Sequence, residues 1–266
     1  MNDGKIEDII RSMETSIVEA SDAIMKIYTE GFNVQIKSDN SPVTEADLKS
    51  NEIIHSHLDK YDEIGWLSEE DKDDLNRLNR EYVFVVDPLD GTQDFVEKDN
   101  SFGINLALVK NGKPIVAFIG VPYYHFYAYA YKGRGSFVFT PDHSREKLRV
   151  SNRTSNLVYL SSKTHEVERE RKLMERHKDK ISQVLHSGAS TKAIMLASGK
   201  GDASVRFTNM TKEWDVCAPD LIVREAGGIF LDTKKKEFTY NRVDVYNHDG
   251  YCMFNRVENM DLLDEE

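Results

Sequence analysis

The sequence is poor in cysteine and contains no long apolar run. Only two cysteines, Cys217 and Cys252, occur among its 266 residues, and no Cys-x-x-Cys pair is present. This excludes a disulfide framework and a zinc knuckle, and it indicates a reducing compartment. No apolar run approaches the ~18 residues that a membrane span needs, and the N-terminus lacks the features of a signal peptide. We therefore expect a soluble, cytoplasmic protein without a membrane partner.

Basic residues are also in short supply. The chain has 35 Lys and Arg residues against 46 Asp and Glu residues, a formal net charge of −11. An acidic protein is a poor candidate for binding nucleic acid, so no such partner is expected. The same charge should repel an anionic substrate unless bound cations reverse the local field.

Several catalytic motifs are absent. The chain has no Gly-x-x-x-x-Gly-Lys-Ser/Thr loop of an NTPase. Phosphatases that form an aspartyl phosphate use Asp-x-Asp, whereas Asp87 and Asp90 are three positions apart. Cys217 has six residues before Arg224, where a cysteine phosphatase has five, and residues 188–192 lack the final glycine of a nucleophile elbow. Any phosphate chemistry should therefore proceed without a covalent enzyme intermediate.

Residues 1–155 are predicted to form an α+β lobe. Apolar residues at helical spacing predict a helix over residues 5–30, and Thr44 and Asp47 are suited to start a second helix that ends near residue 60. Strands are then expected at 63–67, 82–86, 104–109, 115–121, 126–131 and 136–140. Asn111-Gly112 is a hairpin turn signal, so this stretch should be largely antiparallel.

Residues 156–266 are predicted to form an α/β lobe. Strands at 157–160, 181–185 and 203–207 should alternate with helices at 165–177, 190–199 and 215–226. The acidic residues after position 257 are expected to form a solvated tail. The length allows one large domain or two lobes that share a core. We expect metal-binding loops in the first lobe and substrate-binding residues in the second.

The most informative segment is Asp87-Pro88-Leu89-Asp90-Gly91-Thr92, which follows the apolar strand 82–86. Two carboxylates therefore emerge at the carboxyl end of a strand. Gly91 allows a close backbone approach to a ligand, and Thr92 starts a short helix whose free N–H groups can hold an anion. Such a cluster is most often only a turn, so it has to be weighed with other segments.

Three further acidic sites lie at strand ends or helix starts. Glu69 and Glu70 follow the strand at 63–67, Asp215 opens a helix after Trp214, and Asp47 lies in a helix start. Each alone fits a solvated loop or a helix cap, but together they predict a site for divalent cations. Two such cations ~4 Å apart can clamp a phosphate and activate water, and Mg²⁺ prefers carboxylate oxygens.

These segments resemble a known family. Ser68-Glu69-Glu70, Asp87 to Thr92, and Trp214-Asp215 with Gly227-Gly228 are similar, in this order, to the signature segments of the lithium-sensitive inositol monophosphatase superfamily. The match covers essentially the whole chain. Within the superfamily, segments 39–47, 67–71, 163–165 and 212–219 more closely resemble the 3'(2'),5'-bisphosphate nucleotidases. The resemblance implies an α/β (α+β) fold, a layered αβαβα sandwich.

The resemblance also implies roles for individual residues. Glu69 and Asp87, with the Leu89 carbonyl, would bind a first Mg²⁺, and Asp87, Asp90 and Asp215 a second. Asp47 and Thr92 would orient or deprotonate the attacking water, with a third metal ion as an open alternative. The amides of Gly91 and Thr92 would hold the reacting phosphate.

A substrate with a second phosphate needs a second anion site, which the carboxylates cannot provide. The candidates in the second lobe are Thr164, His165, Ser190, Lys192 and Arg206. Simpler interpretations stay open: Ser190 as an N-cap, Arg206 as a surface ion pair and His165 as a polar helix-start residue. The family usually carries serine at position 164, and the stretch from Arg206 to Trp214 is slightly longer than in bacterial relatives. Both departures bear on substrate choice.

The implied function is a phosphoric monoester hydrolase that depends on two or three Mg²⁺ ions. It would convert adenosine 3',5'-bisphosphate to AMP and phosphate by attack of a metal-activated water, and lithium would inhibit it. The alternatives are an inositol mono- or polyphosphate 1-phosphatase with the same metal chemistry, or a non-catalytic metal-dependent nucleotide-binding protein. The partner is thus a small phosphorylated molecule, and the oligomeric state stays open.

Overall fold

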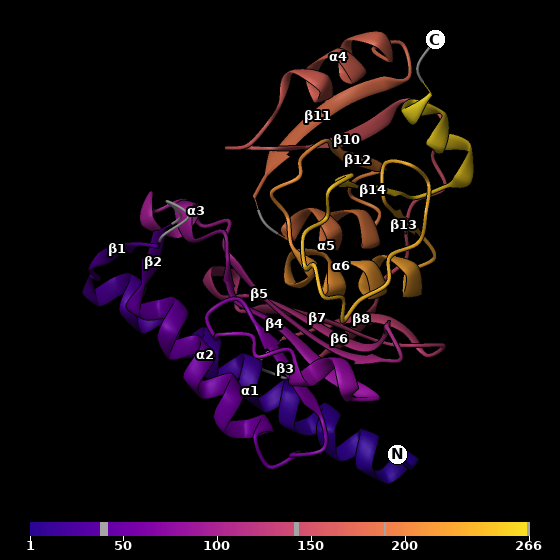
Figure 1. Cartoon of the computed structure of the whole chain (residues 1–266). Coiled ribbons are helices and arrows are strands. Elements are labelled where there is room, and N and C mark those ends of the chain that lie inside the picture. Colours follow the sequence, from indigo (N-terminus) through magenta and orange to yellow (C-terminus); the bar gives the residue numbers. More distant parts are fainter. Residues whose placement is uncertain (38–41, 141–143, 189, 265–266) are drawn as a thin grey trace.

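The computed structural model describes residues 1–37, 42–140, 144–188 and 190–264. Its elements stack in five layers, in the order helices, sheet, helices, sheet, helices (Figure 1). This confirms the predicted αβαβα sandwich. No helix of the described part of the chain has both the length and the apolar character needed to cross a membrane.

The first layer consists of α1 (Asp3–Glu30) and α2 (Glu45–Leu58), which pack against each other. α1 buries Ile6, Ile9, Met13 and Ile17, whose spacing places them on one face. It ends at Gly31, where φ is +101°. α2 starts with the predicted capping box of Thr44 and Asp47, so its amino end is fixed by local hydrogen bonds.

The second layer is a seven-stranded sheet in the order β3-β4-β5-β6-β7-β8-β9, in which only β3 and β4 run parallel. The asparagine of Asn111-Gly112 has φ +48° and the glycine +76°, and this pair forms the predicted turn between β5 and β6. The strands are β3 (Gly65–Ser68), β4 (Tyr82–Asp90), β5 (Gly103–Lys110), β6 (Lys113–Val121), β7 (Phe126–Tyr131), β8 (Gly135–Phe139) and β9 (Arg145–Lys147).

Alternation along β4 shows how this sheet builds two cores. Val83 and Val85 pack on the face toward the middle helices, whereas Phe84 and Val86 pack toward α1 and α2. A strand buried on both faces reads as a continuous apolar run, which is why residues 82–86 were recognisable in the sequence.

The middle helices are α5 (Thr191–Ala197) and α6 (Glu213–Glu225). The second sheet has the order β11-β10-β12-β14-β13, and α4 (Glu168–Arg176) and the 3-10 helix η3 (Val257–Leu263) cover its outer side (Figure 1). Its strands are β10 (Leu157–Ser162), β11 (Ile181–Ser187), β12 (Ala203–Arg206), β13 (Ile229–Leu231) and β14 (Tyr251–Phe254).

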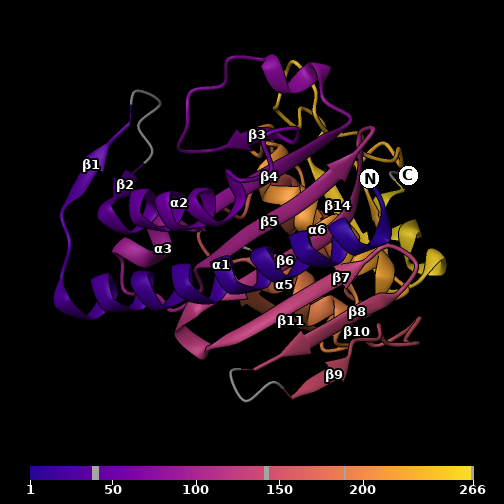
Figure 2. The same cartoon turned by 90° about the horizontal axis from the view of Figure 1, so that it is seen from below.

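Short elements complete the chain. β1 (Val34–Ile36) and β2 (Pro42–Thr44) form a hairpin beside α2 (Figure 2). A single helical turn, α3 (Thr92–Val96), follows the acidic loop, and η1 (Asn76–Asn79) and η2 (Pro122–Tyr124) are short 3-10 turns. The polar turn predicted around residues 38–42 lies mostly outside the described residues.

The structure corrects several predicted boundaries. α4 begins at Glu168 rather than 165, α5 is shorter than the predicted 190–199, and α6 begins at Glu213 rather than 215. The acidic C-terminal stretch forms η3 over its described part and buries Leu262, whereas its acidic residues Glu258, Asp261 and Asp264 are exposed as predicted. The division of the chain at residue 155 stays a prediction.

A buried carboxylate joins the segment between the two sheets to the second sheet. Asp202 is fully buried and accepts hydrogen bonds from the Val158 amide at 2.7 Å and the Asn255 amide at 3.1 Å. The Arg153 Nε also donates to it at 2.7 Å, as does the Ser151 hydroxyl. Each of these donors loses a hydrogen bond if the carboxylate is removed, although the Asn255 side-chain amide keeps acceptors on Ser151 and Arg153.

We therefore predict that Asp202→Ala lowers the free energy of unfolding by about 2–3 kcal/mol. The loss should not be larger, because the Arg153 side chain is 40% exposed and can return to water. Urea denaturation measures it. The control is Asp261→Ala, which removes an exposed pair with Lys180 and should cost less than about 1 kcal/mol. Equal losses of unfolding free energy in the two variants would contradict the stabilising role given to Asp202.

Candidate active site

Two parallel strands bring the first acidic residues together. Ser68 at the end of β3 pairs with Val86 of β4, and the Glu69 amide donates to the Val86 carbonyl at 3.2 Å. Glu69, which directly follows β3, therefore lies beside Asp87 of β4. The two neighbouring strands thus end at the same sheet edge and bring Glu69 and Asp87 together.

The start of α6 supplies the third carboxylate. Asp215 lies in the first turn of α6, where one of its oxygens accepts the Lys212 amide at 2.5 Å. Carboxylate oxygens of Glu69, Asp87 and Asp215 all lie within 4.8 Å of one another. The structure thus gathers acids that are separated by up to 146 positions (215 − 69) in the sequence.

This arrangement suits a cation. Burial and the neighbouring carboxylates, Glu69 above all, raise the pKa of Asp87 and Asp215 well above the ordinary value. Such an increase shows that the charged forms lack compensation, which a divalent ion would provide. The donors are all hard carboxylate oxygens, the ligands that Mg²⁺ or Ca²⁺ prefers. The residues present therefore fit a divalent metal site.

Asp90 lies next to the triad of Glu69, Asp87 and Asp215, but it is also hydrogen-bonded to residues outside this triad. The amide and the hydroxyl of Ser190 donate to Asp90 Oδ2 at 2.8 and 2.6 Å, and Asn105 donates at 3.2 Å. Its other oxygen has no hydrogen bond within the described part of the chain. Gly91 follows with φ +87°, a conformation that a glycine adopts readily.

Asp47 and Thr92 form a pair beside the acidic loop. The Thr92 hydroxyl contacts Asp47 Oδ1 at 2.8 Å and the Leu89 carbonyl at 3.1 Å. Asp47 is almost completely buried, and this burial raises its pKa. Asp47 and Thr92, which the family resemblance assigns to the attacking water, are therefore joined by a direct hydrogen bond.

All of the predicted site residues except Asp47 line one cavity of about 760 Å³. The cavity is lined by the acidic residues and also by Lys192 and Arg206, which are 3% and 6% exposed. Burial, together with Arg206, lowers the pKa of Lys192 to about 8. Thr164 and His165 reach the same cavity from the exposed loop that precedes α4.

One of the simpler interpretations is wrong and another is incomplete. Arg206 is not a surface ion pair, because its guanidinium contacts the buried Glu170 at 2.7 Å and donates to the His165 carbonyl at 2.8 Å. Ser190 is the N-cap residue of α5, but its side chain makes no capping bond. It donates to Asp90 instead, so its amide and hydroxyl are already engaged rather than open to a phosphate.

Sequence reasoning missed three residues of this region. Lys37 contacts Glu69 at 3.1 Å and Glu70 at 2.6 Å, and burial still raises the pKa of Glu70 to about 7. Asn105 lies opposite Asp87 on β5, a position that the strand register would have indicated. Asp94 is buried in the cavity wall, and its Oδ1 has no partner among the described residues.

Because the carboxylates are crowded, we predict that removing the charge of one of them stabilises the folded, metal-free protein. Because the pKa of Asp87 is raised in the folded state, the metal-free protein loses stability as the pH rises through that pKa. Asp87→Asn removes one charge and keeps the oxygen that accepts the Leu89 amide. We expect the variant to be more stable than the wild type at pH 8 by at least ~1 kcal/mol, and by less at pH 5.

Urea denaturation in the presence of a chelator measures this difference. Glu52→Gln, which changes an exposed carboxylate of α2, is the control and should leave the pH dependence unchanged. A chelated Asp87→Asn protein that is less stable than the wild type at pH 8 would contradict the electrostatic interpretation.

Comparisons with known proteins agree with this geometry. The model of the inositol monophosphatase family matches residues 6–257. The 3'(2'),5'-bisphosphate nucleotidase CysQ of Escherichia coli K12 is 29% identical over 237 residues, which cover 87% of this chain and 94% of that protein. CysQ of Buchnera aphidicola is 31% identical over 236 residues, with 84% and 85% covered.

Solved structures share the fold. CysQ from Bacteroides thetaiotaomicron, described as a bacterial member of the inositol monophosphatase family, superposes with a TM-score of 0.80 at 29% identity and covers 92% of this chain and 97% of that chain. SuhB from Bartonella henselae has a TM-score of 0.81 at 24% identity, with 96% of both chains covered. The family match and the CysQ relatives confirm the predicted class of enzyme, a phosphoric monoester hydrolase. The chain belongs to the inositol monophosphatase family.

Proposed function

We propose that this enzyme is a magnesium-dependent 3'(2'),5'-bisphosphate nucleotidase that hydrolyses adenosine 3',5'-bisphosphate to AMP and phosphate. One observation carries the proposal: a single cavity is lined both by a carboxylate triad and by the buried cations Lys192 and Arg206. A substrate with two phosphates needs both groups, the carboxylates with their metal ions for the reacting phosphate and the cations for the other. The similarity to proteins named as bisphosphate nucleotidases supports the same choice.

Glu69, Asp87, Asp90, Asp215 and the Leu89 carbonyl would hold the magnesium ions, two or three in number. When bound, magnesium would lower the pKa of a water molecule and offset the charge that develops on the phosphate. Asp90 remains suited to this role, since only one of its two oxygens is engaged by Ser190 and Asn105.

The chain's own residues would position the water and the phosphate. Because the Thr92 hydroxyl is hydrogen-bonded to Asp47, a water that contacts Thr92 could pass a proton through this pair to the carboxylate. The raised pKa of Asp47 makes that carboxylate a better proton acceptor than an ordinary aspartate. The amides of Gly91 and Thr92, at the start of α3, would donate to the phosphate oxygens.

Lys192 and Arg206, together with Thr164 and His165, would bind the non-reacting phosphate and the sugar. Ser190 would act indirectly, by orienting Asp90. A reducing, cytoplasmic setting suits the two buried free thiols of Cys217 and Cys252. The second candidate is an inositol phosphatase, which the family and several structural neighbours support.

A substrate panel distinguishes the two candidates. We expect Mg²⁺-dependent release of phosphate from adenosine 3',5'-bisphosphate to exceed that from inositol 1-phosphate and inositol 1,4-bisphosphate, and lithium to inhibit it. Asp90→Asn should reduce turnover by at least about a hundredfold, since it removes a charged ligand oxygen. Its melting temperature serves as the control for folding. Preferential hydrolysis of the inositol phosphates would favour the second candidate.

Lys192 provides a test of the second phosphate site. Lys192→Met keeps most of the buried volume but removes the charge, so we expect kcat/KM for adenosine 3',5'-bisphosphate to fall by about tenfold or more. Inositol 1-phosphate, which has no second phosphate, should be affected much less. Lys163→Met, at a half-exposed lysine that pairs with Asp99, is the matched control. An equal loss on both substrates would remove Lys192 from the second phosphate site.

A further inference from the structure

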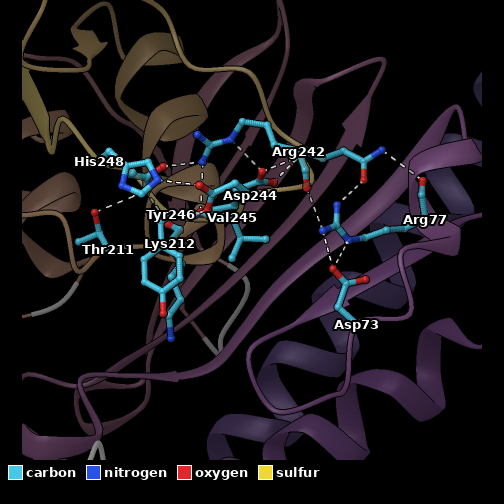
Figure 3. A network of polar contacts seen from close by, with 12 residues as sticks. Asp73, Arg77, Thr211, Lys212, Arg242, Asp244, Val245, Tyr246 and His248 are labelled. Carbon is cyan, nitrogen blue, oxygen red and sulfur yellow. Dashed lines mark hydrogen bonds and ion pairs between the residues drawn. The ribbon is translucent and has the colours of Figure 1, made fainter. Parts of the chain in front are cut away.

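The start of α6, which carries Asp215, is held by a segment far from it in the sequence. This clamp segment, residues 241–247, lies between β13 and β14. Figure 3 shows its contacts, with Asp73 and Arg77 on one side, Arg242 in the middle and Thr211 and Lys212 on the other. These residues belong to none of the predicted metal or substrate sites, yet they contact the backbone that carries a metal-site carboxylate.

Glu213 is the first anchor of the clamp. It is fully buried in the first turn of α6, two residues before Asp215. Its Oε1 accepts the Arg242 Nε at 2.9 Å and the Arg242 amide at 2.8 Å, and its Oε2 accepts the Asn241 amide at 2.6 Å. A buried carboxylate with three donors has little freedom to move, so the first turn of α6 is tied to residues 241–242.

Asn247 is the second anchor, and it acts on the residue that precedes α6. Arg242 Nη2 donates to Asn247 Oδ1 at 2.7 Å. The Asn247 side-chain amide then donates to the Lys212 carbonyl at 2.7 Å, and its backbone amide donates to the Thr211 carbonyl at 2.8 Å. The Lys212 amide in turn donates to Asp215. One arginine therefore holds both the residue before the helix and the first turn of the helix.

Arg77 connects the clamp to the strands that carry the other carboxylates. It is 2% exposed and lies in η1, between β3 and β4. Its Nη1 donates to Asn241 Oδ1 at 2.8 Å and its Nη2 to the Arg242 carbonyl at 2.9 Å. An ion pair with Asp73 at 2.6 Å balances its charge. The connection between the Glu69 and Asp87 strands is thus tied to the start of α6.

We propose that Arg242 is a positioning residue for Asp215, and that the clamp segment keeps this carboxylate at metal-binding distance from Glu69 and Asp87. Three carboxylates within 4.8 Å repel one another, so a rigid frame must hold them together before a cation arrives. Groups that orient metal ligands from behind commonly affect metal affinity as well as activity. The inference deepens the proposed function and rests on it, because it assumes that the triad binds a divalent ion.

The test compares two arginines of similar setting. Arg242 and Arg224 are both 32% exposed, and each pairs with a buried carboxylate of α6, Glu213 and Asp220 respectively. Arg242→Gln should weaken Mn²⁺ binding by about tenfold or more, as measured by electron paramagnetic resonance of the free ion in a titration of the full chain. Arg224→Gln should change it by less than about twofold, with a comparable fall in melting temperature.

Arg242→Lys should restore only part of the affinity, because one ammonium cannot reach Glu213 and Asn247 as the guanidinium does. If Arg242→Gln does not fold, Asn247→Asp replaces it, since this change removes the donor to the Lys212 carbonyl and keeps the side-chain size. Two results would overturn the proposal. One is a Mn²⁺ affinity that falls equally in the Arg242→Gln and Arg224→Gln variants. The other is an unchanged Mn²⁺ affinity in the clamp variant that folds, whether Arg242→Gln or Asn247→Asp.

The outcomes separate this inference from the proposed function. A wild-type protein that neither binds Mn²⁺ nor hydrolyses adenosine 3',5'-bisphosphate would refute the proposed function. A wild type that binds and hydrolyses, with no special effect of Arg242→Gln, would refute the positioning role alone.

Discussion

The mutual repulsion of Glu69, Asp87 and Asp215 is the constraint on which the rest of the structure depends. Two unit charges 4 Å apart repel by about 4 kcal/mol at the effective dielectric constant of a protein surface. These three residues keep their oxygens within 4.8 Å, and burial raises the pKa of Asp87 and Asp215 further. Nothing in the cluster itself favours this arrangement without a cation. The surrounding elements must therefore hold it.

The layered fold supplies that frame from two directions. The parallel pairing of β3 and β4 sets the separation of Glu69 and Asp87, because the register places Ser68 opposite Val86. α6 approaches from the middle layer, where its buried residues pack on the inner face of the first sheet. Core packing therefore contributes to the distance between Asp215 and the strand ends, together with the clamp segment that holds the start of α6. The Ser190–Asp90 hydrogen bonds add a similar link from the start of α5.

The features predicted correctly from the sequence are local ones. The capping box of Thr44 and Asp47, the Asn111-Gly112 turn and the acidic loop after β4 each depend on a few adjacent residues. The features that were missed depend on distant partners. Arg206 meets Glu170 across 36 positions and Arg77 meets Asn241 across 164, which no spacing rule indicates. β13 and β14 are three and four residues long, too short for a periodic signal, and pair only through tertiary context.

The charges that line the cavity suggest an order of binding. Six carboxylate residues line it, Glu69, Asp87, Asp90, Asp94, Glu166 and Asp215, against three basic residues, Lys192, Arg206 and Lys212. The formal sum is −3 (3 − 6). Burial, and after it the neighbouring carboxylates, raise the pKa of Asp87 and Asp215. Arg206 is moreover offset by Glu170.

An anion that enters this cavity alone therefore meets a repulsive field, even beside Lys192. Two divalent cations would add four positive charges and reverse the sign of the sum. Affinity for a bisphosphate at Lys192 should thus depend on metal occupancy of the carboxylates. In an acidic protein, the metal ions would then serve substrate binding as well as the chemical step.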